Sequence, residues 1–359
     1  MSFYSMKSLF GLAGLLVVLV GCQQKKPDVV LAEETVVSPK TSLDKQKLSA
    51  YSFFYGPQKN LQPADGVVEY ALNSPLFSDY AFKKRFVKIP PGQKAGHHPT
   101  EVLDFPEGTI LIKNFYYPAD FNQPQKNIRL LETRLLILEK SEWRPLSYIW
   151  NDEQTDAFLE VAGKSIDVSW THYDGSIKKI SYSVPNLNQC KGCHLKGDKV
   201  MPIGPSARQL NGVLPGEHKI QLVKWQEASL IENLPPIEAI PRLANYENEK
   251  GSINLRARAW LEINCAHCHR SDGSAKTSGL HLLASIKQSS VLGVGKAPVA
   301  AGKGSGGRLY SIVPGKPDES ILQYRIESTH PGIMMPEVGR KLVHTEGVEL
   351  VRRWIAEMK

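Results

Sequence analysis

The chain has 359 residues and a formal net charge of +8, from 44 Lys and Arg against 36 Asp and Glu. This basic balance is mild, and no run of five or more Lys or Arg occurs, so we expect no nucleic-acid partner. Four of the five cysteines lie in two CxxCH strings, which leaves none to build a disulfide framework. A chain of this length predicts two domains.

The N-terminus has the layout of an export signal. The apolar run at 9–20 is shorter than the roughly 20 residues that span a bilayer, which favours a cleaved signal over a transmembrane helix. The string LVGC at 19–22 resembles the bacterial lipobox, which implies a signal peptide over residues 1–21 and lipidation of Cys22. Plain cleavage with Cys22 left as a free thiol is the alternative. By the same resemblance, Gln23 implies sorting to the outer membrane.

The next part of the chain changes from polar to strand-like. Residues 22–48 are polar, contain two prolines and show no sustained period, which predicts a flexible tether. The runs at 109–117 and 129–140 are β-branched, aromatic or alternating, and Asp174-Gly175 marks a hairpin turn. Several short strands with one buried face predict a β-sandwich-like domain over residues 49–184.

The C-terminal part changes to helical periodicity. Residues 185–249 are expected to be a connecting segment, which holds the first CxxCH string and ends in proline-rich sequence. Apolar stripes at 254–269 and 344–359 predict a helix that enters the second CxxCH string and a closing helix. This pair is typical of class I cytochrome c. The predicted fold class is therefore α+β multidomain, with the β-sandwich-like domain followed by an all-α class I cytochrome c-like domain over residues 250–359.

The second CxxCH string predicts covalently bound haem c. In this chemistry two thiols join the haem vinyl groups and the adjacent histidine ligates iron. Cys265 and Cys268 are the expected anchors and His269 the proximal ligand, since residues three and four apart share a helix face. Haem attachment of this kind takes place outside the bacterial cytoplasm, which agrees with the export signal.

A second axial ligand is expected from the loop PGIMMPEVGR at 331–340. Met335 precedes a proline, as the axial methionine of class I cytochromes often does, and Met334 is the alternative. A thioether ligand favours ferrous iron and raises the potential relative to a pair of histidines. If both methionines pack elsewhere, His330 and His344 are the next candidates.

The first CxxCH string is equal in sequence but lies in a different context. Cys190 and Cys193 are expected to attach a second haem, with His194 as the iron ligand. Met201 is the nearest methionine and also precedes a proline, and His218 is the alternative. The segment around this string is short for a complete cytochrome domain.

Zinc bound by Cys190, Cys193 and a histidine is the main alternative to haem. Structural zinc takes four tetrahedral ligands, usually from two separated pairs, and the two CxxC pairs could in principle form one all-thiolate site. The shared histidine offset would then be a coincidence, so haem is the preferred interpretation.

Several strings carry a family resemblance over about 300 residues. The chain resembles a family of bacterial exported c-type cytochrome lipoproteins that are encoded next to a parallel β-helix repeat protein. The resemblance implies haem c and a possible β-helix partner, and it implies no substrate. The strings are NSPLFSDYAFKKRFVKIP (73–90), FPEGTILIKNFYYP, VPNLNQCKGCH, IVPGKPDESILQYRIES (312–328) and PGIMMPEVGRKLVHTEGVELVRRWI.

The expected function is electron transfer by a membrane-anchored periplasmic c-type cytochrome. Its lipid anchor is expected to hold it at the periplasmic side of the outer membrane, and its β-rich domain is expected to dock a redox partner. The alternative is a haem-dependent oxidoreductase, peroxidase-like or substrate-oxidising, with an open iron site at the first haem. No catalytic acid–base group is visible in the sequence, so an electron carrier is favoured over a stand-alone enzyme. A docking module that keeps haem for stability is a third hypothesis.

Overall fold

The computed structural model describes residues 44–359, and these residues belong to one compact unit. The predicted signal peptide, the Cys22 lipidation site and nearly all of the predicted tether lie outside the described residues. Between residues 44 and 359, every helix is too short or too polar to cross a lipid bilayer.

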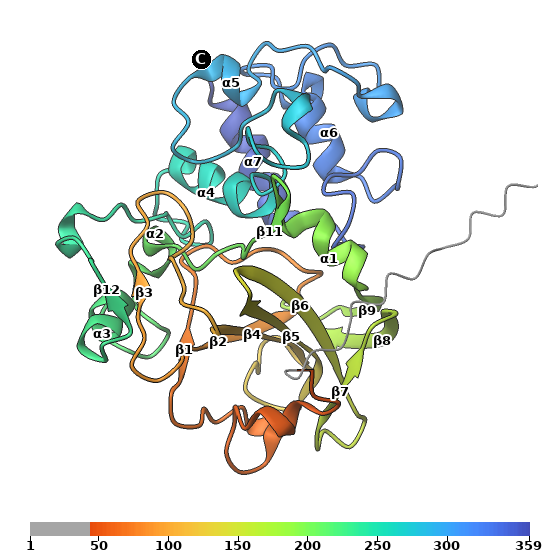
Figure 1. Cartoon of the computed structure of the whole chain (residues 1–359). Helices are drawn as coiled ribbons and strands as arrows, with labels where there is room; N and C mark the ends of the chain where they lie inside the picture. Colours follow the sequence, from red (N-terminus) through yellow and green to blue (C-terminus); the bar gives the residue numbers. More distant parts are fainter. Residues whose placement is uncertain (1–43) are drawn as a thin grey trace, which may run out of the picture. The chain divides into compact units, whose positions relative to one another are not determined.

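A six-stranded antiparallel sheet forms the centre of this unit (Figure 1). The predicted strands at 109–117 and 129–140 are confirmed as β4 and β5, whose β-branched and aromatic side chains suit a buried pleated surface. Alternation along β4 sends Leu111 to one face of the sheet and Ile112 to the other, and both are buried. In sheet order, the strands are β1 (Val67–Tyr70), β2 (Phe82–Lys88), β4 (Ile110–Pro118), β5 (Ile128–Glu139), β6 (Glu142–Trp150) and β7 (Ala157–Glu160).

The predicted hairpin at Asp174-Gly175 is confirmed as β8 (Lys164–Thr171) paired with β9 (Ile177–Val184). Gly175 has a φ of +80°, a left-handed conformation that glycine adopts without strain. The hairpin packs on the central sheet through a cluster that includes Tyr117 and Trp170. A two-stranded hairpin, in place of a second full sheet, therefore covers this part of the sheet.

The segment between β9 and the C-terminal helices covers another part of the same sheet face. Leu210 and Trp225 pack there in one apolar cluster with Leu111. This segment contains α1 (Leu187–His194), β10 (Leu195–Lys196), β11 (Lys199–Val200), α2 (Ala207–Leu210), α3 (Gln221–Glu227) and β12 (Ile231–Glu232), which pairs in parallel with β3 (Ala95–Gly96).

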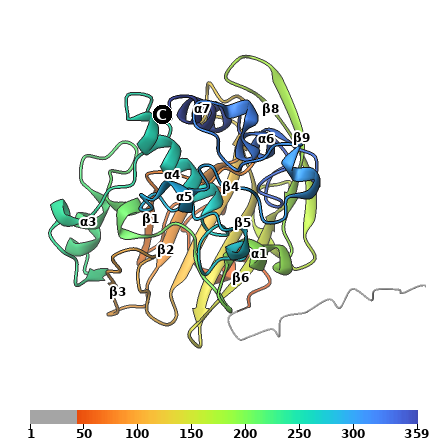
Figure 2. The ribbon, with the colours of Figure 1, turned by 90° about the horizontal axis from the view of Figure 1, so that it is seen from above.

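The C-terminal helices lie over one end of the sheet (Figure 2). The two predicted helices are confirmed as α4 and α7, and these helices pack against each other through Leu261 and Val351. The helices of this part are α4 (Ile253–Cys265), α5 (Ser289–Leu292), α6 (Ile321–Glu327) and α7 (Thr345–Ala356). Short 3₁₀ turns occur at Leu48–Tyr51, Gln58–Asn60, Ile237–Ala239, Lys276–Ser278, Gly302–Ser305 and Pro317–Glu319.

Segment 71–80, which follows β1, ties the sheet to the later parts of the chain. It has no regular secondary structure, so its polar groups find partners in other elements. Burial raises the pKa of the Asp79 carboxyl, which nevertheless accepts two backbone N–H bonds. The hydrogen bonds of segment 71–80, at 2.8 to 3.1 Å, join Asn73 to Asn211, Phe77 to Asn264 and Asp79 to Leu342.

The predicted fold class is wrong. The described residues contain no all-α cytochrome c-like domain: α5 and α6 are short, and long irregular segments separate them from α4 and α7. The core around α4 and α7 also takes in Leu72, Leu76 and Ile203, which belong to the strand-rich and central parts. The apolar stripes of α4 and α7 predicted two helices correctly but could not show that the sheet end shares their core.

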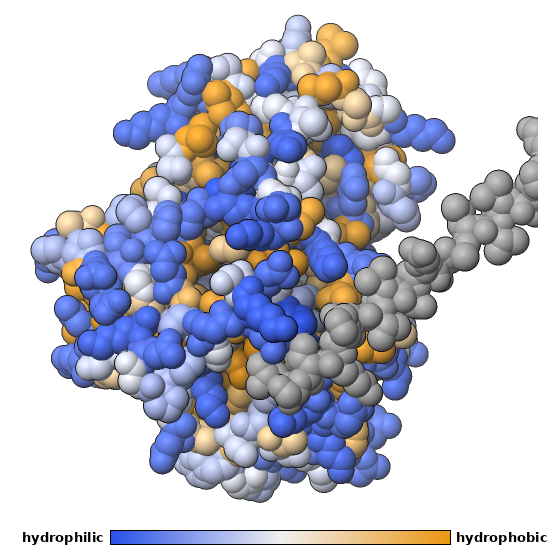
Figure 3. Space-filling view, in the orientation of Figure 1, coloured by the Kyte–Doolittle hydropathy of each residue, from blue (hydrophilic) through white to orange (hydrophobic). Residues whose placement is uncertain are grey.

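The surface in Figure 3 is largely hydrophilic. Hydrophobic side chains on this face gather in small groups, and no broad apolar patch stands out. Small scattered groups of this kind are normal on protein surfaces and do not mark a docking site. The predicted docking of a partner by the strand-rich part therefore stays a prediction.

We expect Leu261→Ala to lower the free energy of unfolding by about 2–5 kcal/mol, because Leu261 is fully buried between α4 and α7 and its removal leaves a cavity. Urea unfolding followed by circular dichroism measures this change. Leu255→Ala on the same helix is the control. The Leu255 side chain is 59% exposed, so the change there should stay within about 0.5 kcal/mol. Equal losses in both variants would contradict this packing.

Candidate functional site

The first CxxCH string forms helix α1. Asn186 and Gln189 close a capping box at its start, with two reciprocal hydrogen bonds of 3.0 Å. Cys190, Cys193 and His194 follow at helical spacing and all line one cavity. The predicted grouping of these three residues is therefore seen in the structure, on a short helix rather than a long entry helix.

The second CxxCH string begins at the last residue of α4. The backbone N–H groups of Cys268 and His269 donate to the Cys265 carbonyl at 3.1 and 2.9 Å, which continues the helical turn through the string. Cys265 is buried, and burial raises the pKa of its thiol to about 12. This thiol is therefore uncharged at neutral pH.

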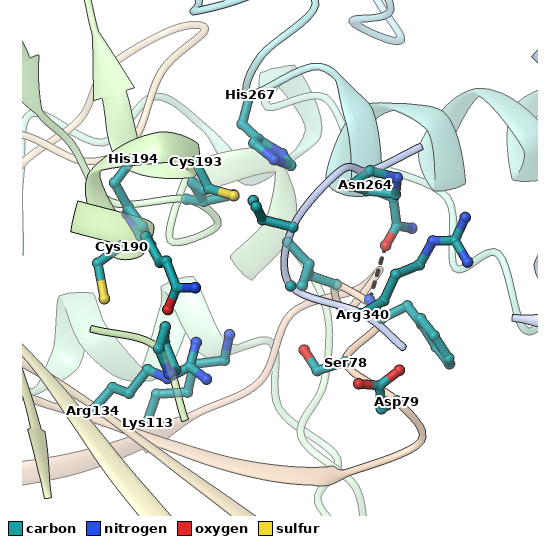
Figure 4. A pocket seen from close by; sticks show the side chains of 18 of the residues that line it. Ser78, Asp79, Lys113, Arg134, Cys190, Cys193, His194, Asn264, His267 and Arg340 are labelled. Carbon is teal, nitrogen blue, oxygen red and sulfur yellow. Dashed lines mark hydrogen bonds between the residues drawn. The ribbon is translucent and has the colours of Figure 1, made fainter. Parts of the chain in front are cut away.

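One cavity of about 330 Å³ lies between α1, the central sheet and the loop after α6. Its volume is within the range of about 300–1,000 Å³ that is typical of cofactor pockets. Figure 4 shows Cys190, Cys193 and His194 on one side of it, with Asn264 from the α4 end opposite. His267 of the second string also lines this cavity, whereas Cys265, Cys268 and His269 are not part of its lining.

His194 is held in one tautomer. Its Nδ1 lies 2.7 Å from the Met201 carbonyl oxygen, which can only accept, so Nδ1 carries the proton and Nε2 keeps its lone pair. Burial lowers the pKa of His194 to about 4. The ring is therefore neutral at pH 7, in the form that ligates a metal through Nε2.

His269 has the same tautomer as His194, but a side-chain hydroxyl fixes it. Its Nδ1 lies 3.0 Å from the Ser278 hydroxyl, and that hydroxyl donates its own proton to the Ala275 carbonyl at 2.7 Å. The Ser278 oxygen must therefore accept from Nδ1, which leaves Nε2 free. Burial also lowers the pKa of His269.

Other histidines with ring hydrogen bonds hold the opposite tautomer. His344 accepts at Nδ1 from the Trp260 indole N–H at 2.9 Å, and His330 accepts from the Gly332 backbone N–H at 3.1 Å. His98 and His172 also accept at Nδ1. Among residues 44–359, the histidines whose Nδ1 donates are therefore His194 and His269, whereas the Nδ1 of His267, also in the second string, has no hydrogen-bond partner. His218 is exposed and does not line the cavity.

The methionines lie in different surroundings. Met335 lines the cavity, and the buried Arg340 guanidinium fixes its loop by donating to the carbonyls of Met335 and Ser328 at 2.8 and 2.7 Å. Met334 is buried. The Met201 carbonyl contacts Nδ1 of His194, and the Met201 side chain packs against the apolar cluster of the sheet. This position gives no support to Met201 as the second iron ligand of the first string.

A row of cations crosses the sheet beneath α1, and sequence reasoning missed it. Arg85 on β2 stands directly opposite Lys113 on β4, and Lys113 stands opposite Arg134 on β5. All three line the cavity, and Figure 4 shows Lys113 and Arg134 on its floor. The signal was a cation in the middle of each of three strand-like runs, but only the strand register places them in one row.

These charges are incompletely neutralised. Arg134 pairs with the fully buried Glu132, whereas neither Arg85 nor Lys113 forms an ion pair with any described residue. Arg85 is 7% exposed, and its Nη2 has no hydrogen-bond partner. Burial and repulsion from Arg85 lower the pKa of Lys113 well below its usual range. Like charges opposite each other destabilise a sheet, so this row is suited to an anionic ligand.

Neither similarity to known proteins nor a cluster of metal-binding side chains adds information about this site. Family models, curated proteins and solved structures gave no match to the chain. Within residues 44–359, no group of three or more His, Cys, Asp or Glu side chains is placed to hold a metal ion, so the all-thiolate zinc alternative gains no support.

Lys83 gives a pH-dependent prediction. Burial, with repulsion from Arg85, lowers its pKa to about 7, whereas an unfolded lysine has a pKa of about 10.4. Between about pH 7 and 10 the unfolded chain binds more protons than the folded one, so stability should rise with pH. We expect Lys83→Met to reduce this rise in urea midpoint. The control Lys84→Met, on the other face of β2, should retain it, and equal slopes in both variants would contradict the assignment.

Proposed function

We propose that the protein is an exported electron-transfer lipoprotein with haem c attached through Cys190 and Cys193 and through Cys265 and Cys268. The observation that carries the proposal is the shared tautomer of the two CxxCH histidines, whose Nδ1 atoms donate and whose Nε2 atoms are free. A histidine that ligates a metal usually donates its other ring N–H to a carbonyl, carboxylate or water in this way.

Cysteine, histidine and methionine side chains would hold different parts of the cofactor. Haem supplies one-electron oxidation and reduction at iron when bound. The thiols would anchor it, and His194 and His269 would each offer Nε2 to iron. Met335, with Met334 as the alternative, is the proposed methionine ligand, because its loop is fixed by Arg340 and faces the cavity.

The cation row supports a haem at the first string. A haem carries two propionate groups, and Arg85 and Lys113 are cations on the sheet side of the cavity that form no ion pair with a described residue. Two carboxylates would balance their charge and satisfy the unpaired Arg85 Nη2. Glu132 has already balanced Arg134.

The oxidoreductase alternative depends on which string uses Met335. If Met335 serves the second string, Met201 lies on the wrong side of His194 to complete the first site. The first string would then have no second protein ligand to offer the iron, and His267 lines the same cavity. A high-spin signal that converts on adding cyanide would favour this enzyme over a carrier.

The location and partner rest on the sequence. Lipidation of Cys22 would hold the protein at the periplasmic side of the outer membrane, and the polar residues before 44 would let the folded unit reach a redox partner. Residues 44–48, placed in the predicted tether, belong to the folded unit, where Leu48 is buried in the core. A parallel β-helix protein is the proposed partner, on the family resemblance alone.

Haem content tests the proposal directly. Pyridine-haemochrome analysis of the exported protein should give two haems per chain, falling to one after Cys190→Ala with Cys193→Ala and to one after Cys265→Ala with Cys268→Ala. The control Ser181→Ala, at an exposed site on β9, should keep both. A protein without any Soret band would overturn the proposal, and one haem that survives loss of Cys190 and Cys193 would remove the first site.

Lys113→Met tests the cation row. Propionates beside Lys113 would keep its side chain protonated, so removing that positive charge should lower the midpoint potential of the first haem, since a nearby cation favours the reduced, less positive state. Spectroelectrochemical titration measures this shift, and the control Lys84→Met should show none. The shift should also be absent when Cys190 and Cys193 are both alanine. An unchanged potential in Lys113→Met would place the propionates elsewhere.

A further inference from the structure

The chain segments that follow the two CxxCH strings are joined to each other. Lys196 and Gly273 form an antiparallel bridge, and the Gly197 backbone N–H donates to the Asp272 carbonyl at 2.8 Å. These residues lie within four positions of His194 and His269, respectively. The two strings are therefore held in register by backbone hydrogen bonding.

Glu101 braces this junction from the strand-rich part. Its carboxylate forms ion pairs with Lys196 at 3.0 Å and with Arg270 at 2.6 Å. Burial alone would raise the pKa of Glu101, but the hydrogen bonds from Arg270 and Lys196 outweigh it and lower the pKa to about 2. One carboxylate thus holds the cation that follows each string.

The second cysteines of the two strings meet at this junction. The Cys268 Sγ lies 3.9 Å from the Gly192 carbonyl oxygen, inside the first string. The proximity of the two thiols raises the pKa of Cys193 and lowers that of Cys268. The sulfur atoms that would carry one thioether of each haem are therefore neighbours.

We propose that the two haems form one electronically coupled pair whose edges meet at Cys193 and Cys268, with Glu101 as the positioning residue. This inference rests on the proposed function. A thioether sulfur is separated from its pyrrole ring by a single carbon, so neighbouring sulfurs bring two ring edges close together. Coupling between the two groups falls steeply with the distance between those edges. The bracing by Glu101 therefore sets the strength of the coupling.

Soret circular dichroism tests the pair, because two close haems give a bisignate couplet. Wild-type protein with two haems should show it, and Glu101→Gln should keep both haems while the couplet falls by about half or more, since the loops are freed to separate. The control Glu232→Gln changes an exposed carboxylate on β12 and should leave the couplet intact. Two haems without a couplet, or an unchanged couplet in Glu101→Gln, would overturn the pair. A haem count below two would instead overturn the proposed function, and the pair with it.

A second measurement reports the sulfur contact without haem. In the full chain with Cys190→Ser and Cys265→Ser, made in cells that lack haem attachment, diamide should oxidise Cys193 and Cys268 to a disulfide. Each thiol loses one proton and one electron, and diamide takes up both pairs to become the hydrazine. Peptide mass spectrometry should find this cross-link, with a lower yield after Glu101→Gln. Both thiols free to alkylation and never cross-linked would refute the contact even if Glu101→Gln folds poorly.

Discussion

Segment 71–80 is the constraint on which the rest of the structure depends. Its irregular backbone cannot satisfy its own polar groups, so it bonds to the central segment through Asn73, to α4 through Phe77 and to the loop before α7 through Asp79. These bonds fix the C-terminal helices on the end of the sheet and close the cavity, which Phe77 and Asp79 both line. The candidate site is therefore a product of the junction and belongs to neither part alone.

The cavity brings together a row of unbalanced positive charges and two cysteines of the first string. The row Arg85, Lys113 and Arg134 places like charges on adjacent strands, and Glu132 balances one of them. Burial makes the imbalance more unfavourable, because water no longer screens the charges. The proposed haem, as a dianionic ligand, would relieve it, and α1 packs against β6 at the same place, with its thiols across the cavity from the cations. In the proposed function, attachment and charge compensation would act on the same ligand.

The sequence predicted local structure well and long-range packing poorly. Period-two alternation located β4 and β5, and apolar stripes located α4 and α7, because these signals depend on neighbours in the chain. The separate all-α domain was wrong because a stripe shows that a helix has a buried face and not what covers it. The cation row and the Glu101 brace were missed for a similar reason, since strand register and a contact spanning 169 residues decide them.

The two candidate iron ligands differ in how firmly their tautomer is fixed. The Met201 carbonyl that faces His194 can only accept a hydrogen bond, so the Nδ1 proton is required in any arrangement of its surroundings. The Ser278 hydroxyl that faces His269 can donate or accept, and it accepts only because the Ala275 carbonyl takes its proton. The second site therefore depends on the short turn at Lys276–Ser278 keeping its shape. The first site depends only on the backbone that brings Met201 back to α1, which explains how a short helix can present a ligand as well as the longer α4.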